Sequence, residues 1–600
     1  MLRRTLLTGA AGAMLAPARG ALAAALAPPP SRVRPGDPGW PSPAEWQALN
    51  ARVGGKLVQP RALFSACADP AQQDACRAML KESANPFFLG DQVGGTQVSG
   101  WFRAWTAAPS AYAIVAHSAQ DVAHGVNFAR EHNLRLVVKG PGHSYLGCSN
   151  APDSLLIWTR PMSEVTVHEA FTPLGCEGRC EATPAVSVGG GAIWIDVYHA
   201  VTVEGGRYAQ GGGCTDVGVA GLVQGGGFGS LSKGFGTAGS SLVEAEVVTA
   251  DGQIRTVNAA RDPDLFWALK GGGGGNFAVL TRLTLETHDL PANFGSVGGT
   301  FKAASDEAFR ALLAQFFAVY ATNLLSEHWG EQVHIGVGNT FEISMLSQGL
   351  TEAEMHAAWK PFLDWVADPK NGVATLEPFY AIAIPSRLFW DLEKHKALGI
   401  KDAHFDDRPG VQPWHGWWNG DAAQVGAFLY GYDSTWLPRG LLAPGRRAEL
   451  AQALFEASRF KQIQLHTNKG LAGAPPAAIA RSRATPMNPA VLDAFTLVIV
   501  ADGALPAWEG SPYPRPDPAA AQKSADAIDA AMRPLRRLAP GAGSYVAESN
   551  FFNANWREEY WGGHYPRLRR IKARYDPAGL FVTHHGVGSE DWSEDGFTRI

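Results

Sequence analysis

The segment GGRYAQGGGCTDVGVAGLVQGGGFGSLSKGFG, residues 205–236, contains 13 glycines in 32 residues and a single cysteine, Cys214. Glycine loses more backbone entropy on folding than any other residue, so a segment this rich in glycine needs a physical reason. One reason is close approach to a ligand, because backbone N–H groups without a Cβ beside them can reach phosphate oxygens. A flexible linker is the alternative, but linkers lack interleaved apolar residues such as Val219 and Val223. The segment therefore predicts a binding site for a phosphate-bearing cofactor.

A second glycine-framed segment, LRLVVKGPGHSYLGCSN, occupies residues 134–150. Its apolar, β-branched run, Leu134–Val138, predicts a buried strand. The strand breaks at Gly140-Pro141-Gly142, and this turn presents His143. A single histidine is more often structural than functional. The position of His143 at a strand-to-loop junction makes it a candidate for function.

These segments resemble the flavoproteins of the vanillyl-alcohol-oxidase superfamily, in particular the berberine-bridge-enzyme-like oxidases. Residues 140–147, GPGHSYLG, resemble the segment whose histidine carries the flavin 8α-methyl group. Residues 211–229, GGGCTDVGVAGLVQGGGFG, resemble the segment whose cysteine bonds carbon 6 of the flavin. Asp264–His288 resembles the end of the family's cofactor domain, and Trp561–Phe581 resembles its C-terminal signature. Each motif alone is modest evidence, but the four occur in the family's order.

The resemblance implies that FAD is bound covalently through both His143 and Cys214. It also implies that the remaining cofactor contacts come from the two glycine segments and one later strand, and it implies no metal. The residues concerned are Lys139, Gly140, Pro141, Gly142, Ser144, Gly147, Val217, Gly218, Gly221, Gly225, Gly226, Gly227, Gly229 and Val279.

The implied fold class is α+β, with a PCMH-type FAD-binding domain of two subdomains and a substrate domain whose antiparallel sheet is backed by helices. The expected boundaries follow from the motif positions. They are a twin-arginine signal peptide at 1–27, an N-terminal arm at 28–100, the FAD-binding domain at 101–290, the substrate domain at 291–540, and a C-terminal berberine-bridge-like segment at 541–600 that returns to the FAD-binding domain.

Local patterns fit this organisation. A helix is expected from Ser118 to about His132, because serine is a favoured N-cap and apolar residues follow at helical spacing. Apolar residues alternate on both sides of a turn at 338–339, which predicts a hairpin over 333–345. The alanine-rich stretch 518–538 predicts a further helix. The glycine run 271–275 lies between a helix and a strand, so it is not the nicotinamide-binding turn, which follows a strand and opens a helix.

The N-terminal sequence predicts export. Arg3 and Arg4 precede a short run of glycine, alanine and leucine, with small-x-small sites at 21–23 and 25–27. This pattern is typical of a cleavable twin-arginine signal and predicts a periplasmic or secreted protein. An uncleaved anchor is the alternative, although the apolar run is short. The rest of the chain offers no membrane span, and a net charge of −5 without a basic stripe excludes nucleic acid as an expected partner.

Export permits disulfides, and the chain has six cysteines. If Cys214 bonds flavin, five remain, so at least one stays unpaired. Cys67–Cys76 and Cys176–Cys180 are the pairs closest in sequence, although sequence does not fix the connectivity. The spacing at 176–180 also fits half of a zinc site, but no second ligand pair lies near, which favours a small disulfide loop.

The expected base departs from the family pattern. Residues 543–552, GSYVAESNFF, resemble the family's Y-x-N-Y stretch, with Tyr545 at the first tyrosine. Glu548 occupies the position where the second tyrosine acts as base in the sugar oxidases, which weakens the case for a sugar substrate. A carboxylate can act as base if burial raises its pKa, and a solvated carboxylate is the alternative. Tyr145 is a further catalytic candidate, with a structural role as its alternative.

A tryptophan-rich stretch and a pair of neighbouring histidines each have more than one possible role. Residues 414–418 contain three tryptophans that are candidates for lining a substrate site, with core packing as the alternative. His584 and His585 fall where family chains pass near the flavin. Neighbouring side chains on a strand point to opposite faces, so a two-histidine metal site is not expected there.

The chain is therefore expected to be an FAD-linked oxidase that takes hydride from a small-molecule donor and reduces molecular oxygen to hydrogen peroxide. The donor classes are an alcohol, a sugar or a secondary metabolite. In this family, valine three residues after the flavin-linked cysteine goes with oxidases, because bulkier side chains fill the void that oxygen needs. Val217 occupies that position. The alternatives are a dehydrogenase of the same fold that reduces a quinone or carrier, and a non-catalytic flavin-binding protein.

Overall fold

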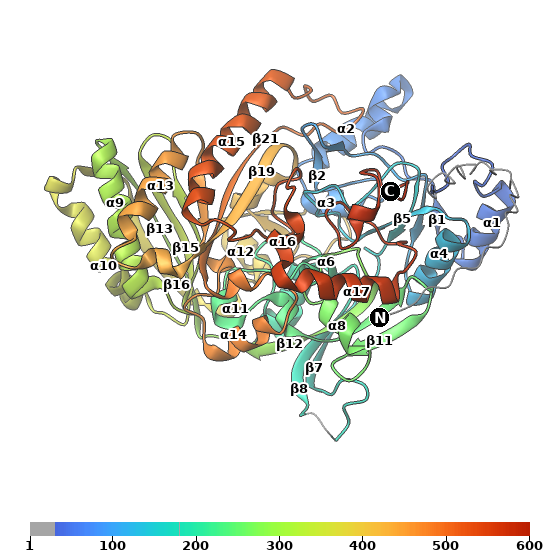
Figure 1. Ribbon diagram of the computed structural model, residues 1–600, viewed down its shortest axis with the longest axis horizontal. Coiled ribbons are helices and arrows are strands. Elements are labelled where there is room, and N and C mark those ends of the chain that lie inside the picture. The colour runs from blue at the N-terminus through green and yellow to red at the C-terminus, as the bar shows by residue number, and fades with distance from the viewer. Residues whose placement is uncertain (1–30, 179–180) are drawn as a thin grey trace, which may run out of the picture.

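The computed structural model describes residues 31–178 and 181–600. The expected signal peptide, 1–27, and Cys180 lie outside these ranges. Within them, strands form three larger sheets of four, six and nine strands. Figure 1 shows the nine-stranded sheet and its helices on one side of the molecule and the two smaller sheets on the other. In the described part of the chain no helix is both long enough and apolar enough to cross a bilayer.

The four-stranded sheet carries the first glycine turn. Its order is β1 (Leu57–Val58), β4 (Tyr112–Val115), β6 (Ser154–Trp158) and β5 (Arg135–Lys139), with β4 and β5 both parallel to β6. The crossover helix α4 (Ala119–Glu131) begins where the sequence predicts, because the Ser118 side chain accepts a hydrogen bond from the Asp121 N–H at 3.2 Å. The end of β5 leads directly into the loop of His143, so the sheet positions that histidine.

The six-stranded sheet supports the second glycine segment. It has the order β11 (Ile254–Asn258), β10 (Leu242–Thr249), β12 (Ala278–Asp289), β8 (Thr183–Gly189) and β7 (Val165–Phe171), and β9 (Arg207–Ala209) pairs with the far end of β12. The β7–β8 hairpin extends below the body of the molecule in Figure 1. The short helix α6 (Val219–Gln224) packs Val219 and Val223 into an apolar core that also contains side chains of β8, β10 and β12. Cys214 therefore sits on a loop fixed at both ends.

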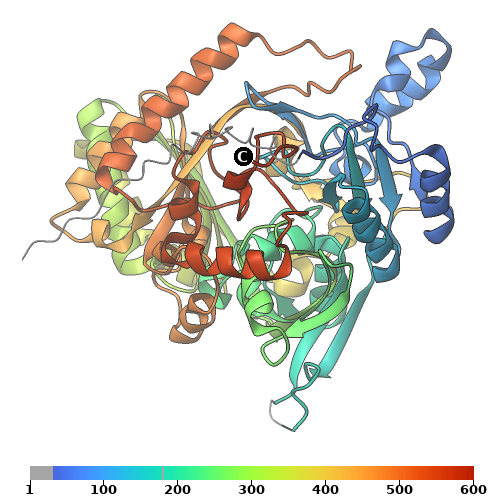
Figure 2. The ribbon, with the colours of Figure 1, turned by 45° about the vertical axis from the view of Figure 1, so that its right-hand side comes forward.

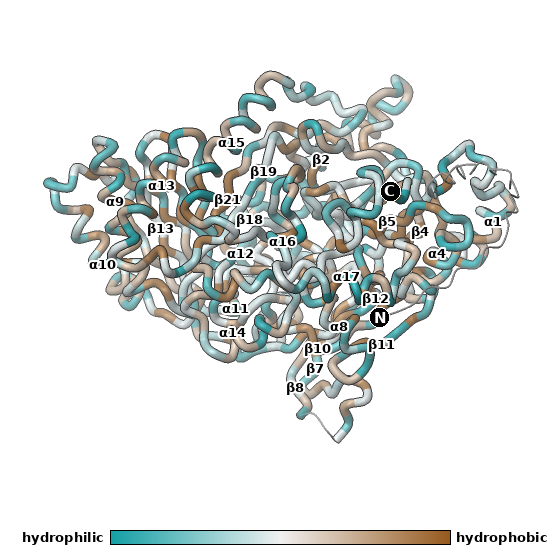
Figure 3. The backbone as a smooth tube through the Cα atoms, in the orientation of Figure 1, coloured by the Kyte–Doolittle hydropathy of each residue, from teal (hydrophilic) through white to brown (hydrophobic). Residues whose placement is uncertain are grey.

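The nine-stranded sheet has one apolar and one polar face. Its order is β16 (Val373–Pro385), β13 (Asn293–Ala303), β15 (Thr340–Gln348), β14 (Trp329–Ile335), β20 (Ile463–His466), β21 (Ala494–Ala504), β19 (Gly426–Pro438), β2 (Val98–Trp101) and β3 (Trp105–Thr106). All pairs are antiparallel except β19–β2. Four helices cover the apolar face: α9 (Asp306–Val319), α10 (Glu352–Ala367), α13 (Arg447–Ser458) and α15 (Pro518–Leu538). Figure 3 shows hydrophobic stretches where β13 and β21 run beneath these helices.

The β14–β15 hairpin shows how the sequence assigns the two faces. Val333 and Ile335 are fully buried against the helices. Gln332 and His334, which alternate with them in the sequence, line a cavity on the opposite face. Because successive side chains of a strand point to opposite faces, the alternation predicted from the sequence produces a packed side and a ligand-facing side.

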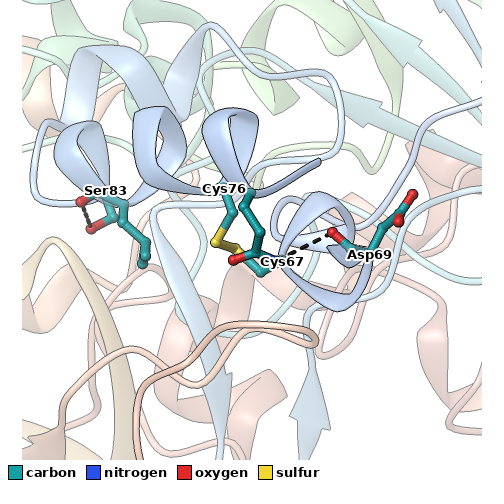
Figure 4. Close-up of a disulfide and its surroundings, with 6 residues drawn as sticks. Cys67, Asp69, Cys76 and Ser83 are labelled. Carbon is teal, nitrogen blue, oxygen red and sulfur yellow. Dashed lines mark hydrogen bonds between the residues drawn. A yellow bond between two sulfur atoms is a disulfide. The ribbon is translucent and has the colours of Figure 1, made fainter. Parts of the chain in front are cut away.

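The N-terminal region contributes to both sides of the molecule. It folds into α1 (Pro43–Arg52), α2 (Gln73–Glu82) and α3 (Pro86–Gly90) before its strands β2 and β3 join the nine-stranded sheet. The Cys67–Cys76 disulfide, expected as one of the two closest pairs, links the 3₁₀ turn Ser65–Ala68 to α2 (Figure 4). Cys176 is also disulfide-bonded. In the described ranges the free cysteines are Cys148 and Cys214.

The C-terminal segment lies against the two smaller sheets. Helix α17 (Tyr565–Tyr575) crosses the lower front of the molecule in Figure 2. The buried ammonium of Lys572 donates to the carbonyls of Asn276 and Phe581 and to Asp576. Phe581 also forms a parallel bridge with Leu136 of the four-stranded sheet. These contacts join the segment from Lys572 to Phe581 to both smaller sheets.

Candidate functional site

A cavity of about 2090 Å³ is lined by residues from all three sheets and from the C-terminal segment. Typical small-molecule pockets measure about 300–1,000 Å³, so this one has room for a dinucleotide and a second molecule. Every site residue predicted from the sequence lines it except two neighbouring glycines. The residues that line it are Lys139, Gly140, Pro141, Gly142, His143, Ser144, Tyr145, Gly147, Cys214, Val217, Gly218, Gly221, Gly225, Gly229, Val279, Tyr545 and Glu548.

The two exceptions, Gly226 and Gly227, have structural roles beside the cavity. Both adopt left-handed backbone conformations, with φ of 95° and 71°. A Cβ at Gly226 would lie 2.2 Å from the Met487 sulfur, and one at Gly227 would lie 2.2 Å from a Leu222 methyl carbon. A turn packed this closely admits only glycine. These two glycines therefore shape the loop and do not face the cavity.

The two glycine segments touch each other. A Cβ at Gly218 would lie 2.7 Å from Cδ of Pro141, so glycine is what lets the Cys214 segment reach the His143 turn. The contact brings together two motifs that are far apart in the sequence. His143 and Cys214 consequently line the same cavity, as the family resemblance implies.

His143 is paired with a carboxylate. Its Nε2 lies 2.6 Å from Oδ2 of Asp216, which is 4% exposed. Because the Nε2 position is occupied by this hydrogen bond, Nδ1 is the nitrogen left for another partner. Asp216 comes from the glycine segment itself, two residues after Cys214.

Cys214 also contacts a carboxylate, which comes from a distant part of the chain. Its thiol donates to Oδ1 of Asp421 at 3.3 Å. Burial raises the pKa of the Cys214 thiol well above its ordinary value, and the carboxylates of Asp421 and Asp216 raise it further. Burial also raises the pKa of Asp421 to about 7. Sequence reasoning missed Asp421; the only signal was its position just after the tryptophan-rich stretch.

That tryptophan-rich stretch has a mixed role. Trp418 lines the cavity, and its Nε1 donates to the Gly213 carbonyl at 3.1 Å. Trp417 is buried in the apolar core that also holds Val219 and Val223, and Trp414 packs against the same core. One of the three tryptophans thus lines the site, while the other two pack as the alternative predicts.

Lys139 lies at the cavity wall, and its ammonium group binds backbone carbonyls of the loop 92–95. Its Nζ donates to the carbonyls of Gln92, Val93 and Gly95 at 2.6–3.1 Å. Burial lowers its pKa to about 7. The side chain therefore fastens the loop 92–95 to the end of β5, and its role toward a cofactor stays a prediction.

The three predicted catalytic residues line this cavity and have different partners. Both oxygens of Glu548 accept hydrogen bonds of 2.6 Å from the Lys469 ammonium. Tyr145 donates to Gln424 at 3.0 Å, and the hydroxyl of Tyr545 lies against the glycine segment near Gly225. Burial, and after it the Glu548 charge, raises the pKa of both phenols. The sequence did not identify Lys469.

The cavity also has features that fit a nucleotide cofactor. A Cβ at Gly221 would meet no atom within 4 Å, so the backbone there is open to the cavity. In the described part of the chain, Asn150 Nδ2, Gln224 Oε1 and Asp421 Oδ2 are buried cavity-lining atoms without a hydrogen-bond partner. A buried polar group without a partner costs free energy, so these atoms fit a ligand rich in hydrogen-bonding groups. The residues present therefore fit FAD.

Comparison with known proteins identifies the family. A model of the FAD binding domain matches residues 109–258, and a berberine and berberine-like model matches residues 544–588. The FAD-linked oxidoreductase notD of Aspergillus sp. (strain MF297-2) is 30% identical over 603 residues, covering 95% of this chain and 90% of the relative. The FAD-linked oxidoreductase penH of Penicillium thymicola is 30% identical over 599 residues, 94% of each chain. The chain belongs to the berberine-like FAD-linked oxidoreductases.

Solved structures share the fold of this chain. The VAO-type flavoprotein MtVAO615 of Myceliophthora thermophila C1 superposes with a TM-score of 0.77 at 25% identity, covering 95% of this chain and all of that one. The glucooligosaccharide oxidase of Acremonium strictum, described as carrying a 6-S-cysteinyl, 8α-N1-histidyl FAD, has a TM-score of 0.61 at 19% identity, covering 86% and 99%. The family and the α+β, PCMH-type fold class predicted from the sequence are confirmed.

The neighbouring histidines differ from expectation. His584 and His585 do not lie on a strand, and His585 has a left-handed φ of 54°. Their rings consequently stack with centroids 3.9 Å apart, so the premise that they point apart was wrong. His585 also stacks on Trp556, and burial lowers its pKa to about 3. Both histidines line the cavity.

The lowered pKa of His585 predicts acid sensitivity. Between pH 6.5 and about 3 the unfolded chain binds a proton at this residue and the folded chain does not, so the free energy of unfolding falls as pH falls through this window. Between pH 7.5 and 5.0 this contribution amounts to about 2 kcal/mol. His585→Asn, which tolerates the left-handed backbone, should lose less stability over that interval than wild type in urea unfolding. The exposed His356→Asn is the control, and equal losses in wild type and His585→Asn would contradict the prediction.

Proposed function

We propose that this protein is an exported FAD-dependent oxidase whose flavin is bonded to both His143 and Cys214. It oxidises an alcohol, a sugar or a secondary-metabolite donor and reduces molecular oxygen to hydrogen peroxide. The observation that carries the proposal is that His143 and Cys214, on separate glycine segments, line one cavity. The covalent FAD described for the glucooligosaccharide oxidase of the same fold supports it.

The cofactor would be held by the open backbone of the glycine segments and by the two linking side chains. FAD, when bound, supplies an acceptor for hydride from the donor and a two-electron reductant for oxygen. The glycine at 221 leaves room for close backbone approach, and Asn150 and Gln224 offer hydrogen-bonding atoms that lack partners in the described residues. Two covalent links would fix the ring rigidly, which favours a defined donor geometry.

The donor side of the cavity supplies the proton chemistry. An alcohol donor loses its hydroxyl proton as the hydride leaves, so a base must lie beside it. Glu548 is the proposed base, with Lys469 balancing its charge. The polar face of the nine-stranded sheet, including Gln332 and His334, would orient the rest of the donor.

The donor class is proposed broadly. Structures of the same fold include a chitooligosaccharide oxidase, TM-score 0.63 at 17% identity, which supports keeping sugars among the donors. Ala547 and Glu548 replace the asparagine and tyrosine expected of the sugar oxidases, which argues for a different donor.

Two further features support export and oxygen use. The arginine pair at Arg3 and Arg4 and the Cys67–Cys76 disulfide fit a compartment outside the reducing cytoplasm. Val217 lines the cavity three residues after Cys214, where a small side chain leaves space for oxygen. A dehydrogenase that reduces a quinone or carrier is the competing function.

The first prediction of the proposed function is that flavin stays attached after denaturation. Purified protein should be yellow and fluoresce on a denaturing gel, and both His143 and Cys214 peptides should carry flavin by mass spectrometry. His143→Ala or Cys214→Ala alone should retain flavin through the other residue, whereas the double variant should release it on acid precipitation. An unmodified Cys214 peptide from flavin-loaded protein would refute the double linkage.

The second prediction concerns Glu548. Glu548→Gln should lower the rate of flavin reduction by ~10²-fold or more, because a general base contributes on this scale. Anaerobic stopped-flow absorbance measures that rate directly. Asp364→Asn is the matched control, since Asp364 is also paired with a lysine at 2.6 Å but on the exposed face of α10. Unchanged reduction in Glu548→Gln would leave Glu548 with a structural role only.

The third prediction concerns the electron acceptor. Val217→Leu should slow reoxidation of the reduced enzyme by dissolved oxygen, because the added methylene fills apolar space in a close-packed wall. The reductive half-reaction, measured in the same instrument without oxygen, should change little. Slow reoxidation of the wild type together with rapid reduction of quinones would favour the dehydrogenase.

A further inference from the structure

Each of the two residues proposed to bond flavin contacts a carboxylate of its own. Asp216 pairs with His143, and Asp421 pairs with Cys214. We infer that these two carboxylates are the proton acceptors that allow the links to form, Asp216 for the histidine link and Asp421 for the cysteine link. The inference rests on the proposed function, because it presupposes that both links exist.

The first pair sets which histidine nitrogen reacts. Asp216 is nearly fully buried, and within the described residues its one ion-pair partner is His143. A hydrogen bond from Nε2–H to this carboxylate keeps the proton on Nε2 and the lone pair on Nδ1. A carboxylate behind an imidazole also stabilises the positive charge that develops when the other nitrogen forms a bond. The pair therefore directs bond formation to Nδ1.

The second pair supplies what a buried thiol lacks. The thiolate is the reactive form of cysteine, and burial raises the pKa of Cys214 well above its ordinary value. The thiol consequently needs a neighbouring base. Burial raises the pKa of Asp421 to about 7, which makes it a stronger base than an ordinary carboxylate. Its second oxygen, Oδ2, has no hydrogen-bond partner in the described part of the chain.

The two carboxylates come from different parts of the fold. Asp216 belongs to the glycine segment, but Asp421 lies in the 3₁₀ turn Asn419–Gln424 that follows the strand Gly416–Trp418. The bond from Trp418 Nε1 to the Gly213 carbonyl holds this turn beside Cys214. The cysteine link thus depends on a segment 207 residues away in the sequence, whereas the histidine link does not.

The chemistry of each link balances with oxygen as oxidant. A flavin C–H bond and a protein N–H or S–H bond are replaced by one C–N or C–S bond, so two hydrogens and two electrons leave. Dioxygen takes them up and becomes hydrogen peroxide. On the protein side, the Nε2 proton of His143 passes to Asp216 and the thiol proton of Cys214 passes to Asp421.

The test separates the two links with four double variants. Asp216→Asn in the Cys214→Ala background can form only the histidine link, and Asp421→Asn in the His143→Ala background can form only the cysteine link. Both should show covalent flavin formation slowed by ~10²-fold, the scale of a lost general base. The readout is in-gel flavin fluorescence and peptide mass after timed aerobic incubation with FAD, which needs no donor substrate.

The crossed variants are the matched controls. Asp216→Asn with His143→Ala should still form the cysteine link without the ~10²-fold slowing, because Asp421 remains beside the thiol. Asp421→Asn with Cys214→Ala should likewise form the histidine link without that slowing, because Asp216 remains beside His143. Asp364→Asn, at an exposed carboxylate of α10 outside the cavity, should keep both links. Normal rates in the uncrossed variants would overturn the inference. Loss of both links from either aspartate change would also overturn it, because that carboxylate would then act on folding or FAD binding. Wild-type protein lacking one link would instead overturn the proposed function.

Discussion

The cavity depends on one physical constraint, the approach of two backbone segments with no Cβ between them. Gly218 lies against Pro141, and a Cβ at Gly229 would lie only 1.6 Å from the Gly211 carbonyl oxygen. A methyl group at Gly218 would push the Cys214 loop away from the His143 turn, and one at Gly229 would distort the glycine segment itself. The entropy lost by ordering so many glycines is offset by the core beneath them, where Val219 and Val223 are fully buried. The position of the cofactor-binding loop therefore depends on the packing of the apolar core beneath it.

The opposite wall depends on strand alternation. Over residues 332–335 of the nine-stranded sheet, side chains alternate between the helix-covered core and the cavity. Val333 and Ile335 are fully buried, while the alternating residues Gln332 and His334 give the cavity wall its polar groups. Changes of donor specificity can therefore accumulate on one face without loss of packing on the other. This separation fits a fold shared by relatives with differently named activities.

Local signals predicted much of this structure, and distant pairings escaped them. Ser118 predicts the start of α4, and the alternation over 333–345 predicts a hairpin. The family motifs predict that His143 and Cys214 share one cavity. Asp421 and Lys469 could not be found in this way, because each reaches its partner across the fold from a segment without a motif. The stacked rings of His584 and His585 were missed for a related reason. Their arrangement depends on a left-handed backbone at a residue that is not glycine.

The parallel pairing of β2 with β19 has a consequence for synthesis. Val98 pairs with Gly426, so the ribosome must add more than 300 residues after β2 before its partner exists. At about 5–20 residues per second this interval is on the order of tens of seconds. During that time β2 can pair with β3 but the edge that later meets β19 stays open, and open strand edges recruit other chains. The nascent protein is thus expected to need shielding by a chaperone until β19 emerges, whatever the stability of the finished fold.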